Sequence, residues 1–237
     1  MGGYRQLDER QIQQTLEELR ERIVERFPDA NLRNVCEELM AATREATEAV
    51  AYIRRPNWPL RLAGAVATVG LAVLLMLIVK VALDAPGEMG TSDIVQSIEA
   101  AVNDVVFFGV AVFFLLTIET RAKRKRALTV LHELRSLAHI VDMHQLTKDP
   151  ERLSSPLKSE GEAGGGATKR KATGATLGRY LDFCSELLSL ISKVSALLVQ
   201  HFNDSEVLSA VNEVEALTTG LSGKIWQKIN ILERSRR

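Results

Sequence analysis

The chain has 237 residues, of which 30 are Lys or Arg and 30 are Asp or Glu, so its formal net charge is zero. This balance, with no nucleic-acid-binding motif in the sequence, gives no reason to expect specific nucleic-acid binding. Two cysteines far apart, Cys36 and Cys184, are too few for a disulfide framework and are expected to be reduced. No strand-like alternation of apolar and polar residues occurs, so we predict an all-α fold.

Residues 1–55 are predicted to form an N-terminal cytoplasmic helical hairpin. Apolar residues from Ile12 to Phe27 recur every three or four positions, which is the spacing of one helix face. Pro28 cannot continue this helix, and Asp29 is placed to cap the next one. The second helix repeats the pattern at Leu32, Val35, Leu39, Ala46, Val50 and Ile53. Two such faces need partners, which predicts packing in a bundle or a coiled coil.

Residues 56–120 are predicted to form a two-span transmembrane helical hairpin with a short acidic external loop. Leu62–Val79 has no charged residue, and its 18 residues correspond to about 27 Å of helix, close to the hydrocarbon thickness of a bilayer. Val105–Ile118 is also uncharged. From position 81 to position 104 the chain has no Lys or Arg, and its acidic residues are Asp84, Glu88, Asp93, Glu99 and Asp104.

The outer end of the second span has two alternatives. Val105–Ile118 alone corresponds to only about 21 Å of helix, which is short for a bilayer. Either Asn103 and Asp104 lie at the outer interface, or the span begins as far back as Ala100. Asp104 is therefore an acidic residue that either marks the interface or faces a pore.

A basic cluster after the second apolar segment sets the expected topology. The cluster consists of Arg121, Lys123, Arg124, Lys125 and Arg126, and Arg54, Arg55 and Arg61 precede the first segment. Because Lys and Arg resist translocation, both flanks and both termini are predicted to be cytoplasmic. The sequence thus predicts an integral protein of the plasma membrane or bacterial inner membrane, with the lipid bilayer as a partner.

The remaining cytoplasmic part is predicted as a stalk helix over 121–150, a flexible linker over 151–176 and a C-terminal helical hairpin over 177–237. The linker is rich in Gly, Ser, Ala and Lys and lacks large apolar residues. In the hairpin, Asn203 is the expected N-cap of the second helix. The apolar faces are expected at Leu177, Leu181, Cys184, Leu188, Ile191, Val194 and Leu198, and at Val207, Val211, Val214, Leu221, Ile225, Ile229 and Leu232.

One polar constellation lies on the stalk, and its residues are His132, Arg135, His139, Asp142 and His144. The first four are spaced by three, four and three residues and so share one helix face. Such a face fits a ligand or partner site, a metal or proton-transfer site, or a hydrogen-bonded layer that fixes helix register. His132 and His139 are about 10 Å apart along the helix, too far to chelate one ion alone. The spacing from Arg135 to His139 is also shorter than in HEPN-type ribonucleases.

The sequence favours a two-pass membrane protein whose cytoplasmic helical bundle mediates homo-oligomerisation or binds a protein partner or signal. One alternative is a membrane-perturbing effector or channel that the bundle gates. Another is a metal-dependent or hydrolytic enzyme that uses the stalk histidines. No catalytic or metal-binding residue set is predicted, and no cofactor is expected.

Overall fold

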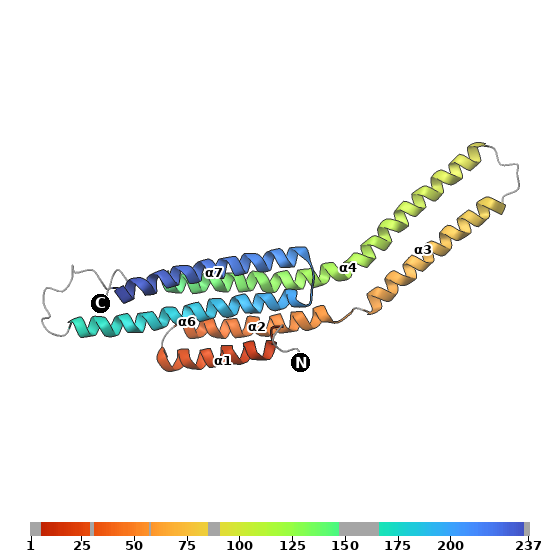
Figure 1. Cartoon of the computed structure of the whole chain (residues 1–237). Helices are drawn as coiled ribbons and strands as arrows, with labels where there is room; N and C mark the ends of the chain where they lie inside the picture. The colour runs from red at the N-terminus through yellow and green to blue at the C-terminus, as the bar shows by residue number, and fades with distance from the viewer. Residues whose placement is uncertain (1–5, 29–30, 57, 85–90, 147–165, 235–237) are drawn as a thin grey trace. The chain divides into compact units, whose positions relative to one another are not determined.

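The computed structural model describes residues 6–28, 31–56, 58–84, 91–146 and 166–234 (Figure 1). In these ranges every regular element is an α-helix, as predicted for the all-α class. The helices are α1 (Glu9–Arg26), α2 (Leu32–Arg54), α3 (Trp58–Asp84), α4 (Thr91–Leu146), α6 (Gly166–Gln200) and α7 (Ser205–Arg234).

The chain divides into two compact units, which we call the bundle and the apolar unit. The bundle combines Met1–Arg54 with Arg124–Arg237, and the apolar unit is Arg55–Lys123. The bundle therefore contains both ends of the chain, and the apolar unit is the segment between them. α4 contributes to both units, because the sequence has no helix breaker between Phe107 and Leu146.

The first two helices follow the predicted apolar pattern. α1 begins after Asp8, whose carboxylate accepts a hydrogen bond of 2.8 Å from the backbone N–H of Arg10. The buried face of α1 consists of Ile12, Leu16, Leu19 and Ile23. All six residues predicted for the second face, from Leu32 to Ile53, are buried in α2. The expected cap Asp29 lies outside the described residues.

α6 is the central helix of the bundle, because it packs against α1, α2 and α7. The predicted stripe from Leu181 to Leu198 is buried, and Tyr180, Phe183, Leu187, Leu190 and Leu197 are buried on further faces. Phe27, which caps the C-terminal end of α1, makes edge-to-face contacts with the rings of Tyr180 and Phe183, at centroid distances of 5.6 and 6.0 Å.

α6 begins at Gly166, inside the segment 151–176 for which the composition predicts a flexible linker. The residues after Gly166 include Ala and Lys, which are good helix formers once a long helix follows them. The part of the predicted linker before Gly166 lies outside the described residues.

The N-cap of α7 is Asp204, one residue beyond the predicted Asn203. The Asp204 carboxylate accepts hydrogen bonds from the backbone N–H groups of Glu206 and Val207, at 3.1 and 3.2 Å. Asn203, Asp204 and Ser205 are all good capping residue types, so composition alone did not identify the position. The buried face of α7 matches the predicted one at six positions. It differs at Ile229, which is only partly buried, and at Thr218, which is buried but was not predicted.

The part of α4 after Arg124 lies in the bundle, where its buried residues are Ala127, Val130, Leu131, Leu134, Leu137, Ala138 and Val141. α4 and α7 run parallel, because polar contacts join Arg124 to Asp204, Arg135 to Glu213, and the carbonyl of Gln145 to Lys228. The Lys228 ammonium lies 3.2 Å from the Gln145 carbonyl, a group that the last turn of α4 leaves without an intrahelical partner.

The apolar unit consists of α3 and the first part of α4, which are antiparallel. Arg61 near the start of α3 forms an ion pair with Glu119 of α4, with 3.2 Å between Arg61 Nε and Glu119 Oε2. Unlike the bundle, this unit leaves its large apolar side chains exposed. They are Trp58, Leu62, Val66, Val69, Val73, Met76, Leu77, Val95, Val102, Val105, Val106, Phe107, Phe108, Val110, Phe113 and Phe114.

Candidate functional site

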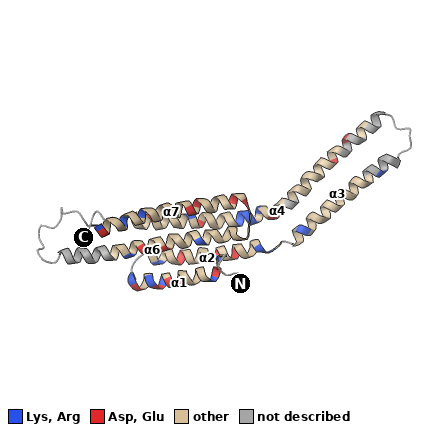
Figure 2. Cartoon of the chain, viewed as in Figure 1, with Lys and Arg blue, Asp and Glu red and all other residues tan. Residues whose placement is uncertain are grey.

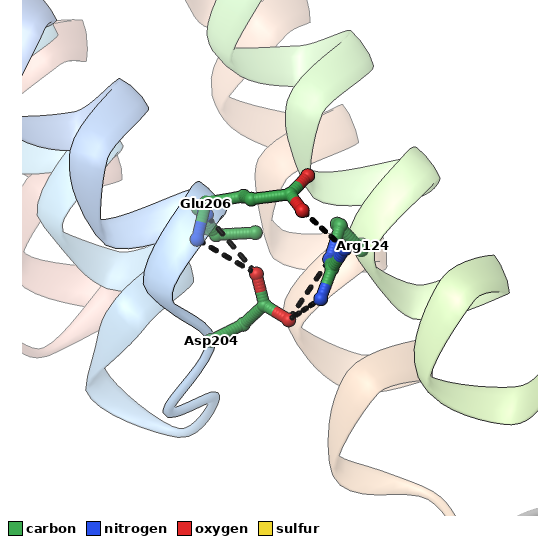
Figure 3. A network of polar contacts seen from close by, with 4 residues as sticks. Arg124, Asp204 and Glu206 are labelled. Carbon is green, nitrogen blue, oxygen red and sulfur yellow. Dashed lines mark hydrogen bonds and ion pairs between the residues drawn. The ribbon is translucent and has the colours of Figure 1, made fainter. Parts of the chain in front are cut away.

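A polar junction in the bundle joins α4 to the start of α7 (Figure 3). Arg124 of α4 donates hydrogen bonds to one carboxylate oxygen of Asp204 through Nε and Nη2, at 2.9 and 2.8 Å. Its Nη1 donates to Glu206 at 2.5 Å. The other Asp204 oxygen caps α7, so a single carboxylate serves both the helix terminus and the arginine.

The electrostatics of Asp204 follow from this geometry. Burial favours the neutral carboxyl, since the Asp204 side chain is only 4% exposed. The hydrogen bond from Arg124 and those from the backbone N–H groups of Val207 and Glu206 outweigh burial, so the pKa of Asp204 lies below its usual value of 3.8. The junction is therefore ionised at neutral pH. Its arrangement holds two helices together and leaves no acid or base poised for proton transfer.

Residues of the predicted basic cluster have unequal surroundings. Arg124 is engaged by Asp204 and Glu206, and Lys123 is 8% exposed and pairs with Glu119 at 2.8 Å. Arg126 lies 3.7 Å from Glu48 of α2 in an exposed pair. Arg121 and Lys125 are exposed, and the Arg121 guanidinium lies over the Phe114 ring, 5.6 Å from its centroid. Composition alone does not indicate that acidic residues elsewhere in the chain neutralise part of this cluster.

The predicted polar face of the stalk lies outside the bundle core. His132, Arg135 and His139 are exposed, and Asp142 and His144 are partly exposed. Each of the first four follows a core position of α4 by one residue, and one residue is about 100° of rotation on a helix. A buried polar layer is therefore not formed by these residues.

The residues of this face contact separate partners and do not converge on a single site. Arg135 pairs with Glu213 of α7 at 3.0 Å, with both side chains more than half exposed. Asp142 accepts a hydrogen bond of 2.5 Å from Gln145, one turn further along α4. Within the described residues, no three His, Cys, Asp or Glu side chains are grouped as metal ligands.

Both cysteines lie in the bundle core and are free thiols. Burial raises the pKa of Cys36 to about 12, and the neighbouring Arg20 offsets only part of this effect. Burial likewise raises the pKa of Cys184 to about 12. Thiols in this state are poor nucleophiles, so these cysteines pack as small apolar side chains.

The bundle surface also has an open pocket of about 370 Å³ between α1 and α2, lined by Glu17, Arg20, Glu37, Met40, Ala41 and Arg44. Arg20 lies 2.5 Å from Glu17 within its wall. The lining has two acidic and two basic side chains, so the pocket carries no net charge that would favour an anion or a cation.

The exposed apolar surface of the apolar unit includes a candidate membrane span. Val102–Gln145 contains a segment long and apolar enough to cross a membrane, and only 6% of that segment is buried. The apolar helix Arg61–Leu77 is shorter. In the part of the chain that the structure describes there is thus one candidate span, where the sequence predicts two. A core helix of a soluble protein would bury most of such a segment, whereas a surface of this kind suits contact with lipid.

Comparisons of the chain with family models, with curated proteins and with solved structures find no match. The functional argument therefore depends on the residues and contacts of this chain.

Proposed function

We propose that this protein is a two-pass integral membrane protein that holds a helical interaction bundle at the cytoplasmic face of the membrane. The observation that carries this proposal is the contrast in burial between the two units. Leu134 and Leu188 of the bundle are 0% exposed, whereas Phe107 and Met76 of the apolar unit are 78% and 73% exposed. Leaving so many large apolar side chains in water is unfavourable, and a bilayer removes that cost.

The composition of the bundle supports an even number of membrane crossings. Met1–Arg54 and Arg124–Arg237 belong to one compact unit with one core. Both ends of the apolar unit must therefore lie on the same side of a membrane. A single crossing by α4 would separate the two halves of the core, whereas two crossings keep them together. In the sequence, the uncharged segment of α3 extends to Val79, giving about 27 Å of helix for the first crossing.

Charge gives the orientation. Along the apolar unit, Figure 2 shows long stretches without charge on α3 and α4, with charged residues densest in the bundle. The bundle end of the apolar unit carries Arg55, Arg61, Arg121 and Lys123, and the segment between the two spans is acidic. Because basic residues are retained on the cytoplasmic side, we place the bundle in the cytoplasm.

An interaction role for the bundle is supported by exposed apolar side chains on its surface. Met143 of α4 and Trp226 of α7 are each 60% exposed, and Ile231 is 43% exposed. Tryptophan and methionine are enriched at protein interfaces. The bundle therefore has surface residues suited to binding a cytoplasmic protein.

The test is cysteine labelling of intact cells in a Cys36→Ala, Cys184→Ala background. Glu88→Cys places a thiol in the acidic segment, and Glu48→Cys places one on the bundle, where the Glu48 side chain is 72% exposed. An impermeant maleimide should label only the first variant, and permeabilised cells should label both. Labelling of only the second variant would reverse the orientation. Labelling of both in intact cells, or release of the protein by alkaline carbonate, would contradict the proposal.

A further inference from the structure

Ion pairs in the apolar unit set the register of its two helices. Glu119 of α4 lies between Arg61 of α3, at 3.2 Å, and Lys123, at 2.8 Å. The Glu119 and Lys123 side chains are only 12% and 10% exposed. The contact joins Arg61, directly before the uncharged α3 segment, to Glu119, directly after the uncharged α4 segment. Positions along both helices can therefore be measured from one level.

Helical rise then gives the depth of two charged residues. Asp104 is 15 residues before Glu119, about 22 Å along α4, and Lys80 is 19 residues after Arg61, about 28 Å along α3. The hydrocarbon layer is about 30 Å thick, so Asp104 lies within it and Lys80 lies near its outer edge. Of the two alternatives for the second span, this register favours the one that begins near Ala100.

A carboxylate at this depth needs a partner, because an unpaired charge in hydrocarbon is strongly unfavourable. At the level of Asp104, α3 of the same chain carries apolar residues, Leu75, Met76 and Leu77. Lys80 is the basic residue of α3 closest to that level, about 6 Å further out, within reach of its long side chain. Asp104 and Lys80 are both exposed, and no ion pair between them occurs in the described residues.

We propose that Asp104 of one copy of this chain pairs with Lys80 of a second copy, so that α4 of one apolar unit packs against α3 of its neighbour. Two copies related by a two-fold axis satisfy both pairs at once. Gly70 and Gly109 support the close approach of a second chain, since a Cβ atom added at either glycine meets no atom within 4 Å. This inference rests on the proposed two-span topology.

Charge reversal in the full-length protein tests the pair. Association is measured in liposomes by energy transfer between copies labelled at Glu48→Cys in the Cys36→Ala, Cys184→Ala background. Asp104→Lys and Lys80→Asp should each weaken association about ten-fold, and the double variant should restore it to within about three-fold of the unreversed protein. Glu99→Lys, a matched reversal outside the pair, should leave association unchanged.

Two outcomes overturn the pairing. In one, the single reversals associate like the unreversed protein. In the other, the double variant is as weak as either single one. If a charge-reversed chain fails to insert, the neutral variants Asp104→Asn and Lys80→Met are used in its place. Each should weaken association, and the variant that carries both should not regain it.

A crosslinking experiment distinguishes pairing between two chains from pairing within one chain. Leu77→Cys and Phe108→Cys, each about one helical turn from Lys80 or Asp104 and both exposed, leave the charged pair intact. They are combined in one chain with no other cysteine and treated with a short bifunctional crosslinker. A dimer is expected, and a crosslink confined to monomers overturns the inference. Maleimide labelling of the Glu88→Cys and Glu48→Cys variants separates this failure from that of the two-span topology, because a single crossing by α4 would leave both sites on the same side of the membrane.

Discussion

The bundle and the apolar unit use similar residue types with opposite results. Leu188 in α6 is 0% exposed and Leu62 in α3 is 65% exposed, although both are leucines in long helices. In the bundle, polar residues on the other faces of α1, α2 and α7 direct each apolar stripe inward. In the apolar unit the side chains are apolar all round the helix, so no inward face is specified. A helix that is apolar on every side therefore has no face that specifies a partner helix in its own chain, and its side chains must be covered by lipid or by another chain.

The largest expected difference between the two units comes from the same Leu→Ala substitution made in each of them. Leu188→Ala should destabilise the bundle by about 2–5 kcal/mol, because it leaves a cavity in a packed core. Leu62→Ala should change bundle stability by less than about 0.5 kcal/mol, because Leu62 makes no core contact there. Protein in detergent is titrated with urea, and the reaction of the buried Cys184 thiol reports opening of the bundle.

Equal effects of these two substitutions on the reaction of Cys184 would mean that the apolar unit and the bundle open together as one cooperative unit. A Cys184 thiol that reacts fully before any urea is added would contradict burial of that residue and its raised pKa.

The polar junction gives a smaller effect with a pH signature. Asp204→Ala should cost about 1–2 kcal/mol at pH 7 through loss of the α7 cap. Asp204→Asn should cost less, since an amide oxygen still caps a helix but lacks the charge that Arg124 binds. Because the folded-state pKa of Asp204 is lowered, its charge stabilises the bundle above about pH 4. This contribution is lost as the pH falls through the folded-state pKa.

Urea titrations at pH 7 and near pH 3 check this prediction. The difference in unfolding free energy between wild type and Asp204→Asn should shrink at the lower pH, while the difference between the Asn and Ala variants should persist. A wild-type advantage over Asn that is constant with pH would show that the Arg124 ion pair contributes little.

The exposed stalk face should give the smallest effect. Arg135→Gln removes an ion pair with Glu213 whose side chains are 52% and 60% exposed, so the cost should be well below about 1 kcal/mol. His139→Leu should have a similarly small effect on stability, since His139 is exposed. Melting curves of both variants provide the measurement. Folded variants that lose a cellular activity would instead identify this face as a binding or catalytic surface.

Periodicity predicted the helices and most of the buried faces, because a stripe repeating every three or four residues has one structural solution. It did not predict that α6 is buried on several faces, since a stripe gives no information on how many neighbours surround a helix. The spacing of His132, Arg135 and His139 correctly put them on one face but did not show which way that face points. A basic residue after an apolar segment fits two roles, contact with lipid headgroups and an ion pair with a carboxylate far away in the sequence. The sequence therefore predicts the topological role of Arg124 but not its ion pair with Asp204, which is 80 residues away.

The discontinuity of the bundle has a consequence for biosynthesis. α1 and α2 leave the ribosome first, but their partner α6 is complete only at Gln200. At typical rates of translation, about 5–20 residues per second, the interval from Arg54 to Gln200 is roughly 7–30 s. During this time the apolar unit emerges while the faces of α1 and α2 that contact α6 are uncovered. In the proposed topology, membrane insertion therefore precedes closure of the core. A chain truncated before α6 should then attract chaperones after insertion, because the faces of α1 and α2 stay uncovered.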